Sequence, residues 1–382
     1  MSDVVVQPVN SWRDRRAFLN FAWELYRHDP IWIPPLVDNI KRLLGWKYHP
    51  FQEVGEVQTF LARRDGQVVG RIAGIVNHDH NRHYHERRGF WGFFESINDQ
   101  AVANALFDTV RSWLAERNMQ ALRGPLNPSL NYEIGLLIEG FDDPPTFMMT
   151  YNPPYYAQLI EGYGFAKTHD LYAYLGVKSM LEGQLKRVAV LLERVKEMFN
   201  IVTRGLDTKH FKEDVESFLQ IYNGACLEIW GFVPISPGEM KWMAKDMKHL
   251  IIPDLTCMAI ADGKPVGAVF GLPDYNPRIK KIKGRLFPFG FLTLLSKKQD
   301  IKRVRLLSTN VMPEYQRWGV GPLLLASLVP KGLEMGMEEA EFSWVSEANL
   351  LATGSLEKGG AKLYKKYRIY DYTPTEHLAK ED

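Results

Sequence analysis

The sequence predicts an α/β protein made of two sandwich domains in tandem, each with a central mixed β-sheet. Three observations support this prediction: a length of 382 residues, a hairpin signature that occurs once in each half, and apolar strands that alternate with amphipathic helices. A compact domain usually holds about 100–200 residues, so a chain of this length is expected to form two. Strand and helix patterns that alternate along the chain are typical of helices covering a sheet.

The composition excludes several classes of protein. Hydrophobic residues make up 46% of the chain and charged residues 24%, which is enough apolar volume for folded cores. The formal net charge of +2 gives no general attraction to nucleic acid or membranes. The two cysteines, Cys226 and Cys257, exclude a disulfide scaffold. No apolar run reaches the roughly 18 residues of a membrane span and no signal peptide is recognisable, so we expect a cytoplasmic protein.

A faint internal repeat sets the expected domain organisation. Residues 61–76 and 258–273 share an Asp-Gly pair, Asp65-Gly66 and Asp262-Gly263, flanked by apolar runs. Asp-Gly supplies the positive φ angles of a tight hairpin turn, so each copy predicts a β-hairpin. A Glu-x-x-Gly landmark also recurs near the end of each half. The repeat predicts one domain over residues 1–177 and a second over residues 178–382.

The remaining elements follow in the same order in both halves. In the first half we expect a helix over 12–27, a strand over 89–95 and a helix carrying residues 102–114. In the second half we expect helices over 178–200 and 210–229, a strand over 304–311, a helix over 323–333 and a strand over 340–345. The helix over 178–200 is interpreted as the linker that opens the second domain.

The segment 311–321, Val-Met-Pro-Glu-Tyr-Gln-Arg-Trp-Gly-Val-Gly, carries the strongest functional signal. It lies between a predicted strand and a predicted helix. Gly319 and Gly321 remove side chains where the backbone must approach a ligand closely, and a helix N-terminus presents free N–H groups to an anion. Pro322 suits the first helical turn, where no N–H is needed. This arrangement indicates a phosphate-binding turn.

This segment resembles the acyl-CoA-binding signature of the GNAT superfamily of N-acyltransferases, with Val311, Pro313, Gln316, Gly319 and Gly321 at the matching places. The resemblance implies that acetyl-CoA or another acyl-CoA is the co-substrate. It also implies which residues hold this co-substrate: Val311, Gln316, Arg317, Trp318, Gly319, Val320, Gly321 and Asn349. The Val311 N–H would polarise the thioester carbonyl while an amine attacks directly.

The sequence departs from the family pattern in two places. In the first half the corresponding run, residues 99–105, has alanines in place of glycines, so we expect this domain to have lost the cofactor and to shape the acceptor site. The family often supplies a tyrosine as general acid four residues before the glycine of its last helix. Leu356 and Ile160 stand at those places, which leaves Tyr364 as the candidate catalytic acid.

The predicted function is therefore acyl-CoA-dependent N-acyl transfer, in its simplest form acetyl transfer, to an amine of a small molecule or amino acid. Two alternatives remain: a Fem-type transferase that uses aminoacyl-tRNA in the same doubled fold, and a non-catalytic acyl-CoA-binding protein. Nucleic acid is otherwise not an expected partner, and the protein is expected to be a monomer or homodimer.

Several other regions carry candidate functional residues. The four histidines of residues 78–85 could ligate a metal, but they are interpreted as a solvated polar loop and no metal is predicted. The loops 127–133 and 151–156 are candidates for acceptor recognition, and Trp230–Pro234 for closing the same cavity. Glu95 lies where relatives of this superfamily sometimes place a general base.

Residues 274–305 are strongly basic, with ten Lys or Arg against two Asp, and they enclose the apolar run 286–295. The simplest interpretation is that the run covers a domain interface or lines an acyl channel. There are three functional alternatives: this region could contact a phosphate of coenzyme A, an RNA or an anionic membrane surface.

Overall fold

The computed structural model describes residues 3–296 and 300–374. The chain divides into two compact units. The first unit consists of Met1–Leu171, Arg278–Gly290 and the segment from Lys365 onward; the second consists of Tyr172–Pro277 and Phe291–Tyr364. The expected boundary at residue 177 lies close to the first of these transitions. The other transitions have no counterpart in the sequence repeat.

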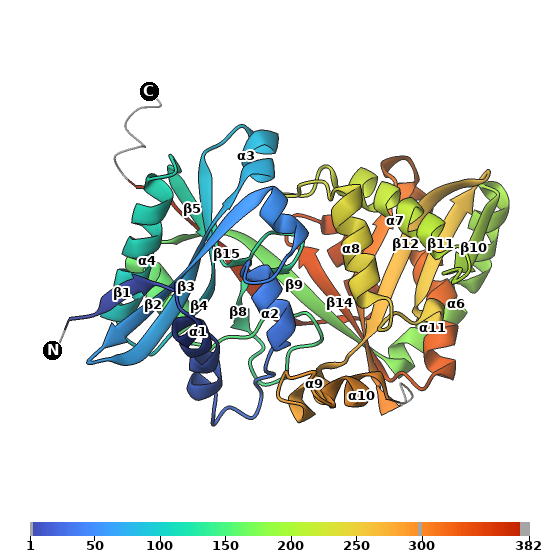
Figure 1. Cartoon of the computed structure of the whole chain (residues 1–382). Coiled ribbons are helices and arrows are strands. Elements are labelled where there is room, and N and C mark those ends of the chain that lie inside the picture. Colours follow the sequence, from blue (N-terminus) through green and yellow to red (C-terminus); the bar gives the residue numbers. More distant parts are fainter. Residues whose placement is uncertain (1–2, 297–299, 375–382) are drawn as a thin grey trace. The chain divides into compact units, whose positions relative to one another are not determined.

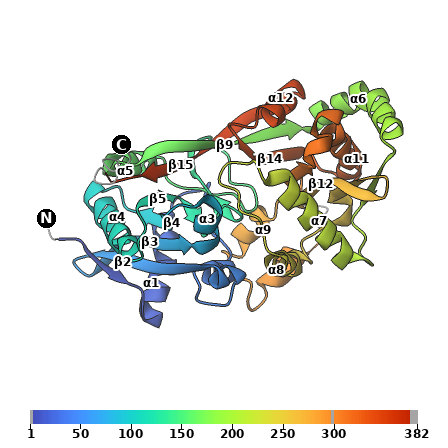
Figure 2. The same cartoon turned by 90° about the horizontal axis from the view of Figure 1, so that it is seen from above.

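The first unit is a mixed sheet covered by helices on both faces (Figures 1 and 2). Its strands lie in the order β1 (Val5–Pro8), β2 (Gly55–Arg64), β3 (Gln67–Asn77), β4 (Arg88–Ser96) and β5 (Ala121–Gly124). Neighbouring strands pair antiparallel except β4 and β5, which are parallel. Residues of β3 alternate between the two faces: Arg71 bonds the carbonyl of Phe18 in α1 (Trp12–Leu25), and Ile72 packs into the cluster formed by α4 (Gln100–Ala115).

The last described strand of the chain completes the first unit. In β15 (Lys362–Tyr372), Tyr370–Tyr372 pair antiparallel with Leu122–Gly124 of β5. Arg123 Nε and Asp371 Oδ1 lie 2.7 Å apart and fix this register. The unit also contains α2 (Val37–Leu43), α3 (His78–Tyr84), β6 (Leu126–Asn127), β7 (Glu133–Ile134), β8 (Leu136–Glu139) and α5 (Tyr156–Tyr163). The strand that follows α5, β9 (Ala166–Val177), contains the first transition between the units.

The second unit repeats the same plan. Its strands lie in the order β14 (Glu339–Ser346), β13 (Arg303–Val311), β12 (Lys264–Pro273), β11 (Thr256–Ala261) and β10 (Ile201–Gly205). Only β13 and β14 pair parallel. Its helices include α6 (Lys178–Met198), α7 (Phe211–Cys226), α8 (Pro237–Met247), α11 (Val320–Glu334) and α12 (Leu350–Lys358). Two short helices, α9 (Asn276–Lys281) and α10 (Gly290–Leu295), overlap the two ends of the stretch Arg278–Gly290 that belongs to the first unit.

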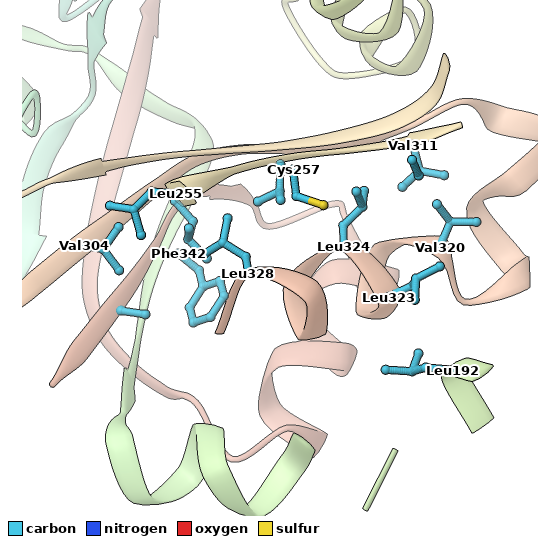
Figure 3. Packing of buried hydrophobic residues seen from close by; sticks show 14 of the residues in the cluster. Leu192, Leu255, Cys257, Val304, Val311, Val320, Leu323, Leu324, Leu328 and Phe342 are labelled. Atoms are coloured by element: carbon cyan, nitrogen blue, oxygen red, sulfur yellow. The ribbon is translucent and has the colours of Figure 1, made fainter. Parts of the chain in front are cut away.

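Period-2 alternation places the core of the second unit on two faces of its sheet. Cys257 and Ala259 of β11 face the leucines of α11, which lie against the strands in Figure 3, while Met258 packs with Ile221 of α7 on the opposite face. Asp65, Gly66, Asp262 and Gly263 all have positive φ, as the hairpin prediction requires. Each half thus contains the predicted hairpin, strand and helix.

Candidate functional site

The site predicted from the sequence lies where β13 leaves its parallel neighbour. The pairing of the two strands joins Arg303–Leu306 to Glu339–Phe342. Beyond this point β13 continues to Val311 without a β14 partner in this register. Residues 307–311 of β13 therefore have no strand partner on this side in the described part of the chain, and this edge is the candidate site.

The backbone of Val311 presents its N–H group to this open edge. Val311 pairs with Gly267, and the Met312 N–H donates to the Val266 carbonyl at 2.9 Å. In an antiparallel ladder these neighbours make Val311 and Gly267 a non-hydrogen-bonded pair, whose polar groups point away from each other. The N–H of Val311 consequently points away from β12.

The side chain of Gln316 forms a hydrogen bond with the backbone carbonyl of Val311. Its Nε2 donates to the Val311 carbonyl at 3.1 Å. The N–H and the carbonyl of Val311 both face this edge, and the carbonyl has Gln316 as its partner within the chain. Gln316 lies in the short 3-10 segment Pro313–Trp318, so the motif glutamine anchors its own turn to the end of β13.

The turn leads into a helix N-terminus that no side chain caps. Gly319 has φ +80°, a conformation that L residues rarely adopt, and its carbonyl accepts the Leu323 N–H at 3.0 Å. The N–H groups of Val320 and Gly321 lie in the first turn, where an α-helix has no internal partners, and the positive end of the helix dipole is there. These features together suit a phosphate group.

The other motif side chains have distinct positions. Val320 is buried and packs against β12, where a Cβ on Gly267 would lie 3.2 Å from it. In Figure 3, Val320 and Val311 lie at the same end of the apolar cluster. Arg317 is exposed, and the half-exposed Trp318 packs edge-on against Phe199 with ring centroids 4.0 Å apart.

Two predicted residues have structural partners of their own. Asn349 caps α12, with its Oδ1 accepting the Ala352 N–H at 3.0 Å. The hydroxyl of Tyr364 donates to the carboxylate of Glu341, which is fully buried. The catalytic role of Tyr364 and the cofactor contact of Asn349 stay predictions.

A buried polar cluster that the sequence did not predict lies next to this edge, between β13 and β14. Arg305 of β13 and Glu341 of β14 face each other in the parallel register, and Arg305 Nε donates to Ser343 Oγ at 2.9 Å. All three side chains are buried. Burying two charges side by side in a sheet is costly unless they are paired, as they are here. The available signal was charged residues at alternate positions within two apolar strands.

The corresponding strand end in the first unit is that of β4, and its backbone N–H already has a hydrogen-bond partner within the unit. Ser96 pairs with Gly70 as Val311 pairs with Gly267, and the Ile97 N–H donates to Val69 at 3.1 Å. The Ser96 N–H, which corresponds to that of Val311, donates to the Tyr156 hydroxyl at 2.9 Å. In the first unit, a tyrosine of the unit itself thus bonds the N–H that corresponds to the Val311 N–H of the second unit.

The space beside β4 is closed as well. The Phe93 N–H donates to Asn127 Oδ1 at 2.7 Å, and a Cβ on Gly92 would collide with the carbonyl of Leu126. Asn127 belongs to one of the two loops predicted to recognise the acceptor. In the other loop, Tyr151 donates its hydroxyl to Asp29 at 2.7 Å. Both loops therefore have structural contacts within the unit, and their proposed role in recognition is untested.

The helix N-terminus of the first unit carries its own negative charge. Asp99 caps α4 by accepting the Ala101 N–H at 2.8 Å, and it forms a 2.8 Å ion pair with Arg64. The hydrogen bond from Arg64 is the main cause that lowers the pKa of Asp99. An ionised carboxylate at this end of the helix repels a phosphate group.

Glu95 is enclosed by donors rather than open to substrate. Its carboxylate accepts the hydroxyls of Tyr26 at 2.8 Å and Tyr156 at 2.7 Å, and Arg71 Nη2 lies 3.4 Å away. Burial raises the pKa of Glu95, and it raises the pKa values of both tyrosines strongly. A carboxylate held by two tyrosines and an arginine is typical of a structural polar network.

The histidine-rich segment forms α3 and a short hydrogen-bonded network. His80 is buried with its Nε2 2.6 Å from Glu86, and burial lowers the pKa of His80. Within residues 3–296 and 300–374, no three His, Cys, Asp or Glu side chains are placed to hold a metal ion. In the same described part of the chain, no helix is both long and apolar enough to cross a membrane.

Comparison with known proteins identifies close sequence relatives. The chain matches no protein-family model. It is 34% identical to protein YghO of Escherichia coli over 366 residues, which cover 94% of this chain and 92% of YghO. It is also 34% identical to the bacterial ceramide synthase of Caulobacter vibrioides over 379 residues, 97% of each protein.

Solved structures with low sequence identity share its fold. A tandem GNAT protein from the clavulanic acid biosynthesis pathway matches with a TM-score of 0.55 and 12% identity, over 97% of this chain and 98% of that one. A GCN5-related N-acetyltransferase from Sphaerobacter thermophilus matches with a TM-score of 0.53 and 12% identity, over 97% and 95%. The predicted tandem α/β architecture and the resemblance to the GNAT superfamily are confirmed. The chain has a tandem GNAT fold and belongs to the family that includes protein YghO and the bacterial ceramide synthase.

Proposed function

We propose that the second unit binds an acyl-CoA and transfers its acyl group to an amine. The observation that carries this proposal is the open edge of β13 next to an uncapped helix N-terminus, with the Val311 N–H turned toward that edge. The proposed phosphate-binding N–H groups and the proposed oxyanion donor would then lie on either side of one turn. The GNAT fold and the sequence motif support the same assignment.

The residues present fit this co-substrate. An acyl-CoA supplies an acyl group activated as a thioester, together with a pyrophosphate. The N–H groups of the turn from Gln316 to Gly321 would bind the pyrophosphate, and Gly319 and Gly321 leave room for it. The Val311 N–H would donate to the carbonyl oxygen, on which negative charge develops as the amine attacks. Gln316 keeps this peptide in place through its bond to the Val311 carbonyl.

The overall reaction forms a C–N bond and breaks the C–S bond of the thioester. The amine loses one proton and the departing thiolate gains one, so that an amide and a free thiol result. Tyr364 is the proposed proton donor, and it would act from its hydrogen bond with Glu341.

A finer proposal concerns the acceptor. One relative at 34% identity is a bacterial ceramide synthase, and a ceramide is the amide of a fatty acid with a long-chain amino alcohol. We therefore propose a long-chain amino alcohol as the acceptor and a long-chain acyl-CoA as the donor. The sequence alone predicts an amine of a small molecule or amino acid as the acceptor. Such amines are the alternative acceptors in the assay.

Release of free thiol tests these assignments. Purified protein is incubated with acetyl-CoA or a long-chain acyl-CoA and either a long-chain amino alcohol or a panel of polar amines. We expect thiol release that depends on both substrates and is greatest for the two long-chain partners. Thiol release with polar amines alone would reject the long-chain acceptor but retain the N-acyltransferase.

The same assay separates the alternatives. An acyl-CoA that raises the melting temperature without thiol release from any amine would indicate a non-catalytic binding protein. Transfer from aminoacyl-tRNA, with no effect of coenzyme A compounds, would indicate a Fem-type transferase. The variant Gly321→Trp is the matched negative control, because its indole would fill the turn.

A further inference from the structure

We infer that the first unit docks on an anionic membrane surface through a basic aromatic tip, defined as Lys281, Lys283, Arg285, Phe287 and Phe289. This proposal concerns where the protein works and is independent of the reaction proposed above. It starts from the stretch Arg278–Gly290, which lies far along the chain and yet belongs to the first unit.

The base of this stretch is anchored firmly. Arg278 and Ile279 are buried, and the Val37 N–H donates to the Gly284 carbonyl at 3.0 Å. Gly284 packs so closely on Pro35 that a Cβ would collide with its carbonyl. The Lys280 ammonium donates to the carbonyl of Pro30. A segment held by these contacts presents its outward side chains from a fixed support.

The outward side chains occur at every second position. Ile282, Gly284 and Leu286 are half-buried or buried, while the five residues of the tip are exposed. Phe287 and Phe289 are 78% and 73% exposed, among the most exposed large apolar side chains in the described part of the chain. Gly290 comes so close to the Arg285 carbonyl that a Cβ would collide, so the Phe-Pro-Phe turn is tightly closed. Two phenylalanines thus project beside three cations.

The positive charge around the tip favours an anionic partner. No acidic residue occurs in the sequence between Asp274 and Asp300. In residues 3–296 and 300–374, none of the three cations of the tip has an ion-pair partner. Exposed aromatic side chains in a basic frame match the interface of a bilayer with anionic lipids, where rings enter the headgroup layer and cations meet phosphate. A protein partner would need an acidic, concave surface and is the competing outcome of the test.

Sedimentation with lipid vesicles tests this proposal without any substrate. The full chain is mixed at low salt with vesicles of phosphatidylcholine alone or with added phosphatidylglycerol. We expect binding to the anionic vesicles, much weaker binding to the neutral ones, and loss of binding as salt rises. Wild-type protein that does not bind the anionic vesicles would overturn the proposal.

Three variants locate the contact. Phe287→Ser with Phe289→Ser should lower the partition coefficient about tenfold or more, because both rings leave the interface. Lys281→Gln with Lys283→Gln should lower it about fivefold per charge at low salt and much less at high salt. Trp12→Ser removes a 67% exposed aromatic residue of the same unit and should leave binding unchanged. Because these positions are exposed, the variants should keep the wild-type melting temperature.

Two other results would contradict the docking surface. Vesicle binding that survives both double variants would place the lipid contact elsewhere. Self-association in sedimentation velocity that the Phe287/Phe289 variant abolishes, without any vesicle binding, would assign the tip to a second copy of the chain.

Discussion

The ends of β4 in the first unit and β13 in the second have the same backbone plan but different hydrogen-bond partners. Both strands end in the same ladder geometry, Ser96 opposite Gly70 and Val311 opposite Gly267. In the first unit the N–H at this point is bound by Tyr156. In the second it points to an edge without a partner strand. The difference lies in a few side chains, because the backbone plan is shared.

The helices that follow these strands, α4 in the first unit and α11 in the second, also differ in their contacts. In the first unit Asp99 caps α4 and brings a negative charge, whereas α11 begins at Gly319 with no side-chain cap. A helix N-terminus can neutralise one anion, and in the first unit that anion is part of the protein. These contacts support the proposal that the second unit alone binds a ligand at this point.

The largest expected effect comes from filling the open turn. Gly321→Trp places an indole where the pyrophosphate would bind, so we expect the Kd for coenzyme A to rise about a hundredfold or more, equal to about 3 kcal/mol. Ala101→Trp is the matched control, since Ala101 is an exposed residue in the first turn of α4. Isothermal titration measures both. An equal loss of coenzyme A affinity in the two variants would contradict the proposal that the second unit alone binds coenzyme A.

The next largest effect concerns stability in the first unit. Tyr156→Phe leaves the buried Ser96 N–H without its acceptor and removes a donor from Glu95, so we expect the free energy of unfolding to fall by about 1–3 kcal/mol. Coenzyme A binding should not change. Tyr163→Phe on the same helix is the control, because its hydroxyl bonds exposed Asp108. Urea unfolding checks this prediction, and equal stabilities of the two variants would refute it.

A smaller effect on catalysis is expected at Gln316. Gln316→Ala removes the hydrogen bond to the Val311 carbonyl, worth about 1 kcal/mol, so kcat/KM should fall about fivefold. Glu314→Ala, an exposed change in the same turn, should have little effect. Steady-state thiol release compares the two. If Gln316→Ala retained full activity, its proposed positioning role would be lost.

The smallest effect is a pH dependence of the cap on α4. The pKa of Asp99 is lowered in the folded state, so its carboxylate adds stability above the ordinary pKa of 3.8 and loses it as pH falls below that value. Asp99→Asn keeps a capping oxygen but not the charge. We expect it to cost about 0.5 kcal/mol near neutral pH, a difference that shrinks in acid. A difference that grows in acid would have the wrong sign.

Much of the fold was predictable because it rests on local signals. The Asp-Gly turns, the helical periodicity of residues 102–114 and the glycine motif before α11 each have a direct backbone consequence. The membership of residues 365–372 in the first unit was not predictable, since pairing with β5 depends on long-range register. The burial of Glu95, Arg305 and Glu341 was equally hidden, because a sequence does not show which charged side chains find partners across strands.

The site was predictable in part for the same reason. The alanines of residues 99–105 predict a first half without the cofactor, and this stays a prediction. The side chains that bond the end of β4, Tyr156 and Asn127, come from segments far along the chain and could not be identified from the sequence. Asn349 was predicted from its place in the family pattern, and Tyr364 because it lies near the place where this sequence has Leu356 in place of the family tyrosine. Their contacts, a helix cap and a bond to Glu341, follow only from the folded structure.

The binding stoichiometry of coenzyme A tests the central claim most directly. Isothermal titration of the wild-type chain should give one site per chain, and Gly321→Trp should abolish it. Two sites per chain, or one site that persists in Gly321→Trp, would show that the closed first unit also binds the ligand and would contradict the account.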